Sequence, residues 1–345
     1  MPRGRSADAS NRRRSRLRLL CRRVLAGDCR GQIVLAVNRR RRTADVGCRR
    51  SDPVATLDSA LDATSVALDH RHCAGVECGA AVCIVGWASP LVSAGILFPN
   101  TAWLGLAATL ALPGFLLNKS TRGTALFTAV ATSLVLNFRA KPLDTPKGWE
   151  PETTRIHRGR TSNALAEFSI EQYLQRVAVS SKGTVLVFPE GAVRRWTDIT
   201  DDFWSSALAD SGKTVLIGAA QPIAGSSRNN NSVVVVGGHP QAAVHQRVPV
   251  PGGMWNPLAR EGGFALNLAS PGTVDVGGER AAVLICYEQL LTWPILRPSI
   301  ERQTLLIAVS NEAWTGRTVV PSIQHACVRA WARLFGLPLL SGINS

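Results

Sequence analysis

Residues that could carry nucleophilic chemistry stand where apolar, strand-like runs end. Glu190 follows one such run, Cys286 ends a second, and Ser310 ends a third. A thiolate at Cys286 could attack a carbonyl or nitrile carbon, while the carboxylate of Glu190 takes the thiol proton and returns it to the leaving group. A fixed cation or N–H donors would stabilise the oxyanion. Spacing alone leaves open the alternative that Cys286 is a small buried hydrophobe.

The elements that must position these residues are the strands of an α/β domain. Beyond Pro142, short runs rich in Val, Ile and Leu alternate with polar, helix-like stretches. The pattern predicts strands at 184–188, 214–218, 232–236, 281–286 and 304–310, and helices at 162–179 and 322–334. Because ligand sites of α/β folds usually lie at the carboxyl ends of the strands, we expect the three strand ends to share one pocket.

Several segments resemble motifs of the nitrilase, or carbon-nitrogen hydrolase, superfamily. Residues 187–192, with Glu190, resemble its carboxylate motif, and residues 284–288, with Cys286, resemble its nucleophile motif. The ordered series of motifs is similar to the apolipoprotein N-acyltransferase branch and covers these further segments: 308–314 and 324–325. Residues 248–255, together with the apolar segments before the domain, resemble the TraB family of plasmid conjugal transfer proteins.

The resemblance implies a fold and a reaction for residues 148–345. The fold is a four-layer α-β-β-α sandwich. The reaction is that of a Glu-Lys-Cys triad, which cleaves or transfers an acyl group at a carbon–nitrogen or ester bond. Glu190 would be the general base, Cys286 the nucleophile and Glu288 a supporting carboxylate. The substrate would be an acyl or amide compound, and neither a metal nor an organic cofactor is implied.

The lysine of that triad is the main departure from the family pattern. Lys213 is the only lysine between Glu190 and Cys286, and it opens a predicted strand at the edge away from the pocket. Gln246 aligns with the expected lysine, and Arg247 follows it. Arginine supplies a positive charge but not a readily shifted ammonium. Two alternatives follow: Arg247 holds the oxyanion, or the site is degenerate.

Other residues near the motifs are predicted to support the pocket. The supporting set is Gln246, Tyr287, Glu288, Glu312 and Trp314. Glu312 could equally stabilise its own loop, and Trp314 could simply pack, as single tryptophans often do. His325 is interpreted as structural, and Met254 replaces a carboxylate of the acyltransferase branch, so lipoprotein is not supported as the substrate.

Two functions are therefore predicted side by side. The first is a membrane-anchored, Cys-dependent amidase or N-acyltransferase of the TraB type that acts in plasmid conjugal transfer. The alternative is a catalytically inactive membrane scaffold, or an interaction component of the same machinery. Retention of Glu190 and Cys286 favours the enzyme, whereas the absent lysine favours the scaffold.

The first part of the chain is strongly basic. Of the formal net charge of +15, residues 1–50 carry most, because they contain 16 Arg and 3 Asp and neither Lys nor Glu. We expect residues 1–78 to form a disordered, Arg-rich arm. Such a charge could bind phosphates of nucleic acid or anionic lipid. Residues 1–50 have no aromatic residue to stack on bases and match no DNA-binding motif, so a nucleic-acid partner is not expected.

Residues 79–139 are predicted to be a transmembrane region. No Asp, Glu, Lys or Arg occurs from residue 79 to residue 118. Apolar runs at 80–98, 102–117 and 124–138 predict two or three membrane spans, with a buried helical hairpin as the alternative. The positive-inside rule applied to three spans places the catalytic domain on the periplasmic side of the bacterial inner membrane, and two spans would reverse this.

The cysteines and the end of the chain complete the sequence-based picture. No pair of the 8 cysteines has the C-x-x-C spacing of a zinc or redox site, so neither a metal site nor a disulfide framework is predicted. Family members continue with further strands past the segment that matches residues 339–345. The resemblance therefore predicts missing C-terminal strands and an open sheet edge.

Overall fold

The structure, a computed structural model, describes residues 89–345 except 159–162, 239–241, 257, 260 and 317. The Arg-rich arm predicted for residues 1–78 lies outside the described residues, as does the beginning of the first apolar run.

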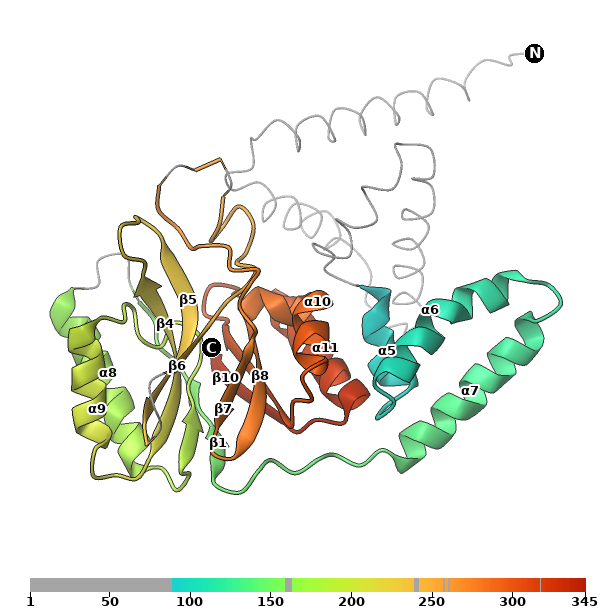
Figure 1. The fold of residues 1–345 in the computed structure, drawn as a ribbon, viewed down its shortest axis with the longest axis horizontal. Helices are drawn as coiled ribbons and strands as arrows, with labels where there is room; N and C mark the ends of the chain where they lie inside the picture. Colours follow the sequence, from blue (N-terminus) through green and yellow to red (C-terminus); the bar gives the residue numbers. More distant parts are fainter. Residues whose placement is uncertain (1–88, 159–162, 239–241, 257, 260, 317) are drawn as a thin grey trace, which may run out of the picture. The chain divides into compact units, whose positions relative to one another are not determined.

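Two five-stranded sheets form the centre of the domain (Figure 1). The first has the strand order β1 (Trp149–Pro151), β3 (Val185–Val187), β4 (Thr214–Pro222), β5 (Asn229–Gly237) and β6 (Ala242–His245). The second has the order β2 (Thr153–Thr154), β10 (Leu339–Asn344), β9 (Leu305–Asn311), β8 (Glu279–Ile285) and β7 (Thr273–Val276). Antiparallel pairing is confined to β4–β5, β5–β6 and β7–β8 among the described strands.

Helices cover the outer face of each sheet, which makes four layers. The first sheet packs against α8 (Ala164–Ser180) and α9 (Asp198–Leu208), and the second against α10 (Trp293–Ser299) and α11 (Val320–Phe335). Side chains of both sheets meet in a central core between them. The predicted α-β-β-α sandwich is therefore confirmed.

The two buried faces of each sheet explain why the strands read as continuous apolar runs. In β3, Val185 and Val187 face the central core, whereas Leu186 faces the layer of α8 and α9. Burial on both faces removes the apolar–polar alternation of a half-exposed strand. The five strands predicted from such runs are all present, as β3, β4, β5, β8 and β9.

Within the described residues, three further helices lie before the domain in the sequence. They are α5 (Ser93–Leu97), α6 (Trp103–Leu117) and α7 (Arg122–Arg139), and α5 follows the short 3-10 turn η2 (Pro90–Val92). Gly95 of α5 lies against α11, because a Cβ there would stand 1.8 Å from the carbonyl oxygen of Ala330. Asn137 of α7 donates to the carbonyl oxygen of Ile96 at 2.9 Å. These contacts join the helices to the outer face of the second sheet.

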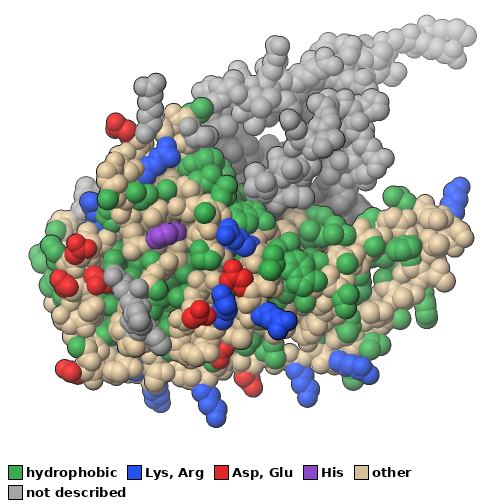
Figure 2. Space-filling model, in the orientation of Figure 1, with side chains coloured by type: hydrophobic (Ala, Val, Ile, Leu, Met, Phe, Trp, Pro, Cys, Tyr) green, Lys and Arg blue, Asp and Glu red, His purple; other side chains and the backbone are tan. Residues whose placement is uncertain are grey.

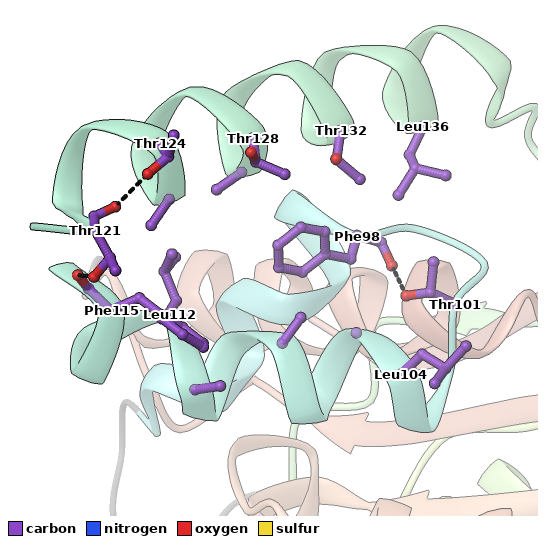
Figure 3. Close-up of a pocket in the computed structure, with 15 residues that line it drawn as sticks. Phe98, Thr101, Leu104, Leu112, Phe115, Thr121, Thr124, Thr128, Thr132 and Leu136 are labelled. Carbon is purple, nitrogen blue, oxygen red and sulfur yellow. Dashed lines mark hydrogen bonds between the residues drawn. The ribbon is translucent and has the colours of Figure 1, made fainter.

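Between α6 and α7 lies a groove of about 570 Å³. Figure 3 shows Leu104, Leu112 and Phe115 of α6 facing a row of residues on α7: Thr124, Thr128, Thr132 and Leu136. Large apolar side chains are also exposed on these two helices, and many lie on the face seen in Figure 2. In the described part of the chain, no helix combines the length and the apolar character needed to cross a bilayer, so the predicted spans are not confirmed.

The last strand, β10, is paired along both of its sides. It runs parallel to β9 from Leu339 to Asn344, and Ile343 and Asn344 also pair with β2. At these last positions the strand is thus an interior member of the sheet rather than an open edge. This pairing brings the Asn344 side chain close to the strand ends that carry the candidate site.

Candidate active site

Glu190 and Cys286 meet in one cavity. The cavity measures about 420 Å³, and both side chains line it. The Cys286 thiol lies beside the Glu190 carboxylate, close enough for each group to shift the pKa of the other. Both residues are almost fully buried, with exposed fractions of 7% for Glu190 and 5% for Cys286. The predicted convergence of the acid and the sulfur is what the structure shows.

A glycine in the neighbouring strand makes room for Glu190. The chain leaves β3 through Phe188 and Pro189 and passes directly over β4 at Gly218. A Cβ at Gly218 would lie 2.3 Å from the carbonyl oxygen of Pro189 and 2.5 Å from the Cα of Glu190. A larger residue would push the loop, and with it the carboxylate, out of the cavity.

Cys286 occupies a sharp turn between β8 and the short helix η3 (Cys286–Leu290). Its φ angle is +51°, in the left-handed region that non-glycine residues rarely adopt. Such a conformation costs of the order of 1–3 kcal/mol and persists where the surrounding structure holds it, often at functional sites. The turn leaves the sulfur next to the N–H groups of Tyr287 and Asn311, which oppose the rise in its pKa.

Two further donors hold the Glu190 carboxylate. The Asn231 side chain, on β5, donates from Nδ2 to Oε1 at 2.7 Å. The backbone N–H of Asn311, the last residue of β9, donates to Oε2 at 2.9 Å. Together with the Cys286 thiol, these contacts give each carboxylate oxygen a fixed direction inside the cavity.

Burial controls the protonation of the pair. It raises the pKa of Glu190, although the hydrogen bonds from Asn231, Cys286 and the Asn311 N–H oppose this shift. It also raises the pKa of Cys286 well above 9.0, and the negative charge of Glu190 acts in the same direction. The resting sulfur therefore keeps its proton, and a thiolate forms only when Glu190 accepts that proton.

Two amide side chains are linked to Glu190 by hydrogen bonds. Gln246 is fully buried, and its Oε1 accepts a hydrogen bond from Asn231 Nδ2 at 2.8 Å. Its own Nε2 donates to the carbonyl oxygen of Ile285 at 2.8 Å. The chain Gln246–Asn231–Glu190 thus fixes the carboxylate by neutral dipoles. Lys213 lies elsewhere, where its Nζ donates to the carbonyl oxygens of Ser181 and Gly183.

The structure corrects the suggestion that Arg247 holds the oxyanion. Arg247 is fully buried and is not part of the cavity lining. Its guanidinium forms an ion pair with Glu288 at 3.0 Å and also donates to two carbonyl oxygens, of Pro294 and Val283. Because these bonds direct the group away from the cavity, Arg247 is a structural residue. The position of Arg247 next to Gln246 in the sequence does not determine the direction of its long side chain.

Glu288 and Tyr287 support the site from behind. The carboxylate of Glu288 accepts from the backbone N–H groups of Ile285, Arg247 and Val248, and so ties the nucleophile turn to the loop after β6. The Tyr287 side chain packs in an apolar cluster with Val248, while its backbone N–H faces the sulfur. Neither side chain lines the cavity.

Of the two candidates after β9, Trp314 reaches the cavity and Glu312 does not. Trp314 lines the cavity and remains 66% exposed. Glu312 instead pairs with His325 at 2.6 Å and accepts from the Ser310 hydroxyl at 3.1 Å. This pair fastens the loop with Trp314 to α11, which agrees with the interpretation of His325 as structural.

Asn231 and Asn311 are the functional residues that sequence reasoning missed. Asn231 ends a run of three asparagines at the start of β5, which continues with Ser232 and four valines. The polar residues at the start of this apolar strand were the available signal. Asn311 acts through its backbone N–H, so its residue type carried no signal. Within the residues that the structure describes, no three His, Cys, Asp or Glu side chains group into a metal site.

Comparison with known proteins gives two relatives that cover most of this chain. The conjugal transfer protein TraB of Agrobacterium fabrum is 33% identical over 275 residues, which are 76% of this chain and 63% of that protein. The probable conjugal transfer protein TraB of Sinorhizobium fredii is 33% identical over 272 residues, which are 76% of this chain and 68% of that protein. This chain thus spans less than two thirds of the length of the first relative.

More distant similarities exist in sequence and in structure. The apolipoprotein N-acyltransferase of Nitrosomonas europaea is 26% identical over 189 residues, 51% of this chain and 36% of that protein. An amidase from Nesterenkonia sp. has a TM-score of 0.43 at 15% identity, over 57% of this chain and 74% of that one. A carbon-nitrogen hydrolase from Helicobacter pylori has a TM-score of 0.43 at 14% identity, over 56% and 72%. No protein-family model matches the sequence.

Proposed function

Because the chain belongs to the TraB family of conjugal transfer proteins, within the nitrilase superfamily, we propose that it is a cysteine-dependent amidase or acyltransferase acting in plasmid conjugal transfer. One observation carries the chemical part of this proposal: the Cys286 thiol and the buried Glu190 carboxylate lie side by side in the lining of one cavity. Burial of a carboxylate costs free energy, and a buried cysteine that only packs has no need of one.

The geometry suggests how the pair would react. As the carbonyl carbon of an amide approaches, the sulfur of Cys286 forms a bond to it and Glu190 takes the thiol proton. The tetrahedral intermediate then loses its carbon–nitrogen bond, and Glu190 returns the proton to the leaving amine. Water or an acceptor amine attacks the thioester and regenerates the thiol. The N–H groups of Tyr287 and Asn311 lie beside the reacting sulfur throughout.

In the part of the chain that the structure describes, no lysine or arginine side chain forms an ion pair with Glu190, and this predicts a slow reaction. Neutral donors stabilise developing negative charge less than an ammonium does, and one lost oxyanion donor typically lowers kcat by about 10²–10³-fold. The buried amides Gln246 and Asn231 keep the carboxylate in place but add no charge. This arrangement is the specific observation that favours the second candidate function, an inactive scaffold of the transfer machinery.

Covalent labelling separates the two functions. The full chain, extracted from membranes, is incubated with p-nitrophenyl octanoate, and the acylated peptides are identified by mass spectrometry. We expect an octanoyl adduct on Cys286 that falls at least tenfold in Glu190→Gln, which keeps the side-chain shape but cannot accept the proton. Cys327, a buried thiol on α11, serves as the internal control. Equal labelling of both cysteines, unaffected by Glu190→Gln, would establish the scaffold.

We further propose that the protein is attached to the bacterial inner membrane, with the catalytic domain on the periplasmic side, where it would contact other conjugal transfer proteins. The support is the apolar pair α6 and α7, with Lys119 and Arg122 at the turn and Arg139 at the end of α7. A membrane-impermeant maleimide applied to intact cells should modify Cys286. Modification only after permeabilisation would place the domain on the cytoplasmic side.

A further inference from the structure

A buried glutamine of α11, Gln324, is bonded to the backbone of the nucleophile. Gln324 lies near the beginning of α11 and is 5% exposed. Its Nε2 donates to the carbonyl oxygen of Cys286 at 3.2 Å. An unpaired polar group in the interior costs free energy, so this bond is an obligatory part of the packing between α11 and the nucleophile turn.

The bond from Gln324 fixes a peptide group with two polar ends. The carbonyl of Cys286 and the N–H of Tyr287 belong to the same trans peptide, which is planar, so the two groups point in opposite directions. The side chain that holds the carbonyl therefore also sets the direction of the N–H. That N–H lies next to the sulfur, where it opposes the rise in the pKa of Cys286.

The backbone at Cys286 makes the direction of this peptide sensitive to its partners. The φ angle of +51° lies in the left-handed region, which is small for a residue with a side chain, so the turn tolerates only a narrow range of carbonyl directions. Strain of this kind persists only where neighbouring groups hold the backbone. Gln324 is such a group, because its amide holds the carbonyl oxygen from the adjacent layer.

The helix that carries Gln324 is itself firmly held. Trp331 and Leu334 of α11 are fully buried in the core behind the second sheet. His325, the neighbour of Gln324, pairs with Glu312 in the loop after β9. A donor on a packed helix keeps its position better than a donor on a loop. The amide of Gln324 is thus a fixed reference point for the nucleophile turn.

We propose that Gln324 is a positioning residue for acyl transfer, which holds the Cys286 carbonyl so that the Tyr287 N–H points at the oxyanion of the tetrahedral intermediate. This inference rests on the proposed function, because it assigns a role in the same reaction. The other N–H beside the sulfur, that of Asn311, donates to Glu190 and so serves the base. A hydrogen bond to the carbonyl also polarises the peptide, which makes its N–H a stronger donor.

The step that needs this donor is the addition of the sulfur to a carbonyl group. The sulfur of Cys286 forms a bond to the carbonyl carbon, its proton passes to Glu190, and the π electrons move to the oxygen, which becomes the oxyanion. With p-nitrophenyl octanoate, the carbonyl then re-forms and p-nitrophenolate leaves. Alkylation by iodoacetamide uses the same sulfur and the same proton transfer, but it displaces iodide and places no charge on an oxygen. Only acylation requires the oxyanion donor.

The test compares these two reactions at one sulfur in the full-length protein. Quenched-flow samples analysed by mass spectrometry give the rates of octanoylation and of alkylation at Cys286. Gln324→Met keeps the length of the side chain but cannot donate. Loss of one oxyanion donor typically slows a reaction by about 10²–10³-fold, so a misdirected donor should slow octanoylation at least about tenfold, while alkylation stays within about threefold of wild type.

Gln175→Met is the matched control. Gln175 is a buried glutamine on α8, and its Nε2 donates to the carbonyl oxygen of Phe203 at 3.1 Å. Gln175 does not line the cavity. Its variant therefore loses the same kind of buried hydrogen bond without any change at the nucleophile turn, and both rates should stay within about twofold of wild type.

Gln324→Glu gives a second readout, which does not depend on the folding of the Met variant. The introduced carboxyl can donate to the Cys286 carbonyl when it is protonated but not when it is ionised. The ratio of the octanoylation rate to the alkylation rate should therefore fall as the pH rises. Both rates need the proton transfer to Glu190, so the titration of Glu190 cancels in this ratio, and the wild-type ratio should not change with pH.

The outcomes separate this inference from the proposed function. If Gln324→Met slows both reactions equally, slows neither, or behaves like Gln175→Met, Gln324 does not position the oxyanion donor, and the enzyme remains. A ratio that is independent of pH in Gln324→Glu leads to the same conclusion. If p-nitrophenyl octanoate does not label Cys286 in the wild type, the enzymatic function itself is lost, and the role of Gln324 with it.

Discussion

At the scale of single residues, the site consists of one proton shared between a buried acid and a buried thiol. Glu190 and Cys286 each have a raised pKa, because burial disfavours the charged form of both. The resemblance to the nitrilase superfamily predicts an ammonium that would stabilise either negative charge, whereas the side chains bonded in a row to Glu190 are the buried amides Asn231 and Gln246. The acidity of Glu190 therefore controls when the sulfur is reactive.

The first prediction concerns the pH dependence of that reactivity. Glu190 accepts the thiol proton only when it is ionised, so reactivity is lost as the pH falls through its pKa. Because burial raises this pKa above 4.5, the loss should occur at a higher pH than for an exposed glutamate. Stopped-flow alkylation of Cys286 by iodoacetamide across the acidic range measures the midpoint. The Glu190→Gln variant should show no such loss of alkylation rate in the acidic range. A midpoint at or below pH 4.5 in the wild type would contradict the assignment of Glu190 as the proton acceptor.

The second prediction tests the missing cation. Gln246→Lys places an ammonium beside Asn231 and Glu190, where it can still donate to the carbonyl oxygen of Ile285. A nearby positive charge favours the thiolate and the carboxylate, so Cys286 should alkylate about tenfold faster near neutral pH. Arg247→Lys is the control, because that side chain points toward Glu288. If the alkylation rate rises equally in both variants, or rises in neither, a cation at position 246 does not activate Cys286.

At the scale of elements, β10 connects the end of the chain to the site. Asn344 is 2% exposed, and its Oδ1 accepts from the hydroxyl of Thr154 and the N–H of Ile156, at 2.8 and 2.6 Å. Its Nδ2 donates to Asn311 Oδ1 at 3.0 Å. Since the N–H of Asn311 donates to Glu190 and lies beside Cys286, the network holds the peptide that faces the reacting atoms.

The third prediction is that Asn344 positions the site rather than only stabilising it. Asn344→Asp keeps the shape and the acceptor but cannot donate to Asn311, so the Asn311 peptide should shift. We expect alkylation of Cys286 to slow about three- to tenfold and its acidic midpoint to move, with a stability loss of about 1–3 kcal/mol. Thr154→Val, which removes a different bond to Asn344, should lose stability alone. If alkylation of Cys286 depends on pH in the same way in both variants, Asn344 has a structural role only.

The fourth prediction concerns the ion pair behind the nucleophile turn. Arg247 and Glu288 are 0% and 1% exposed at their side chains, so removal of one partner leaves a buried charge. Arg247→Met should therefore destabilise the protein by about 3–5 kcal/mol. In Arg247→Met with Glu288→Gln, where neither charge remains, much of that loss should be recovered. Urea unfolding followed by tryptophan fluorescence measures both, and a double variant as unstable as the single one would argue against an unpaired charge as the cause.

At the scale of the whole molecule, the helices α6 and α7 form an apolar region among the described residues. α6 and α7 expose large side chains such as Leu104, Leu117 and Phe127, at 78%, 81% and 75%. A groove with apolar walls runs between the two helices (Figure 3). Exposed apolar patches of this extent mark interaction surfaces in folded proteins. The basic residues at both ends of the helix pair suit a surface of anionic lipid.

The fifth prediction follows from this surface. Leu117→Gln combined with Phe127→Gln should reduce flotation of the protein with vesicles of phosphatidylglycerol and phosphatidylethanolamine by tenfold or more, because each buried large side chain contributes about 1.5–3 kcal/mol. Ile199→Gln is the matched control, since Ile199 is 82% exposed on α9. Unchanged flotation of the double variant would show that the helix pair does not carry membrane binding.

The elements that the sequence missed share a physical cause. The five predicted strands are buried on both faces and so appear as apolar runs, whereas β1, β2 and β6 are short or partly exposed. The sequence of β10 mixes apolar and polar residues, because its positions alternate between buried and half-buried. Such strands are defined by their pairing partners, which lie far away in the sequence.

The sequence by itself determined the layered α/β fold and the family, and it predicted that Glu190 and Cys286 share one pocket, because strand ends and local motifs are encoded by neighbouring residues. Tertiary structure alone decided which group stands beside Glu190 and which way Arg247 points. Long side chains and backbone N–H groups are directed by packing between distant segments, as in the pairing of Arg247 with Glu288 and the approach of Asn311 to the sulfur. For this reason the missing cation was visible in the sequence, but its replacement by a buried pair of amides was not.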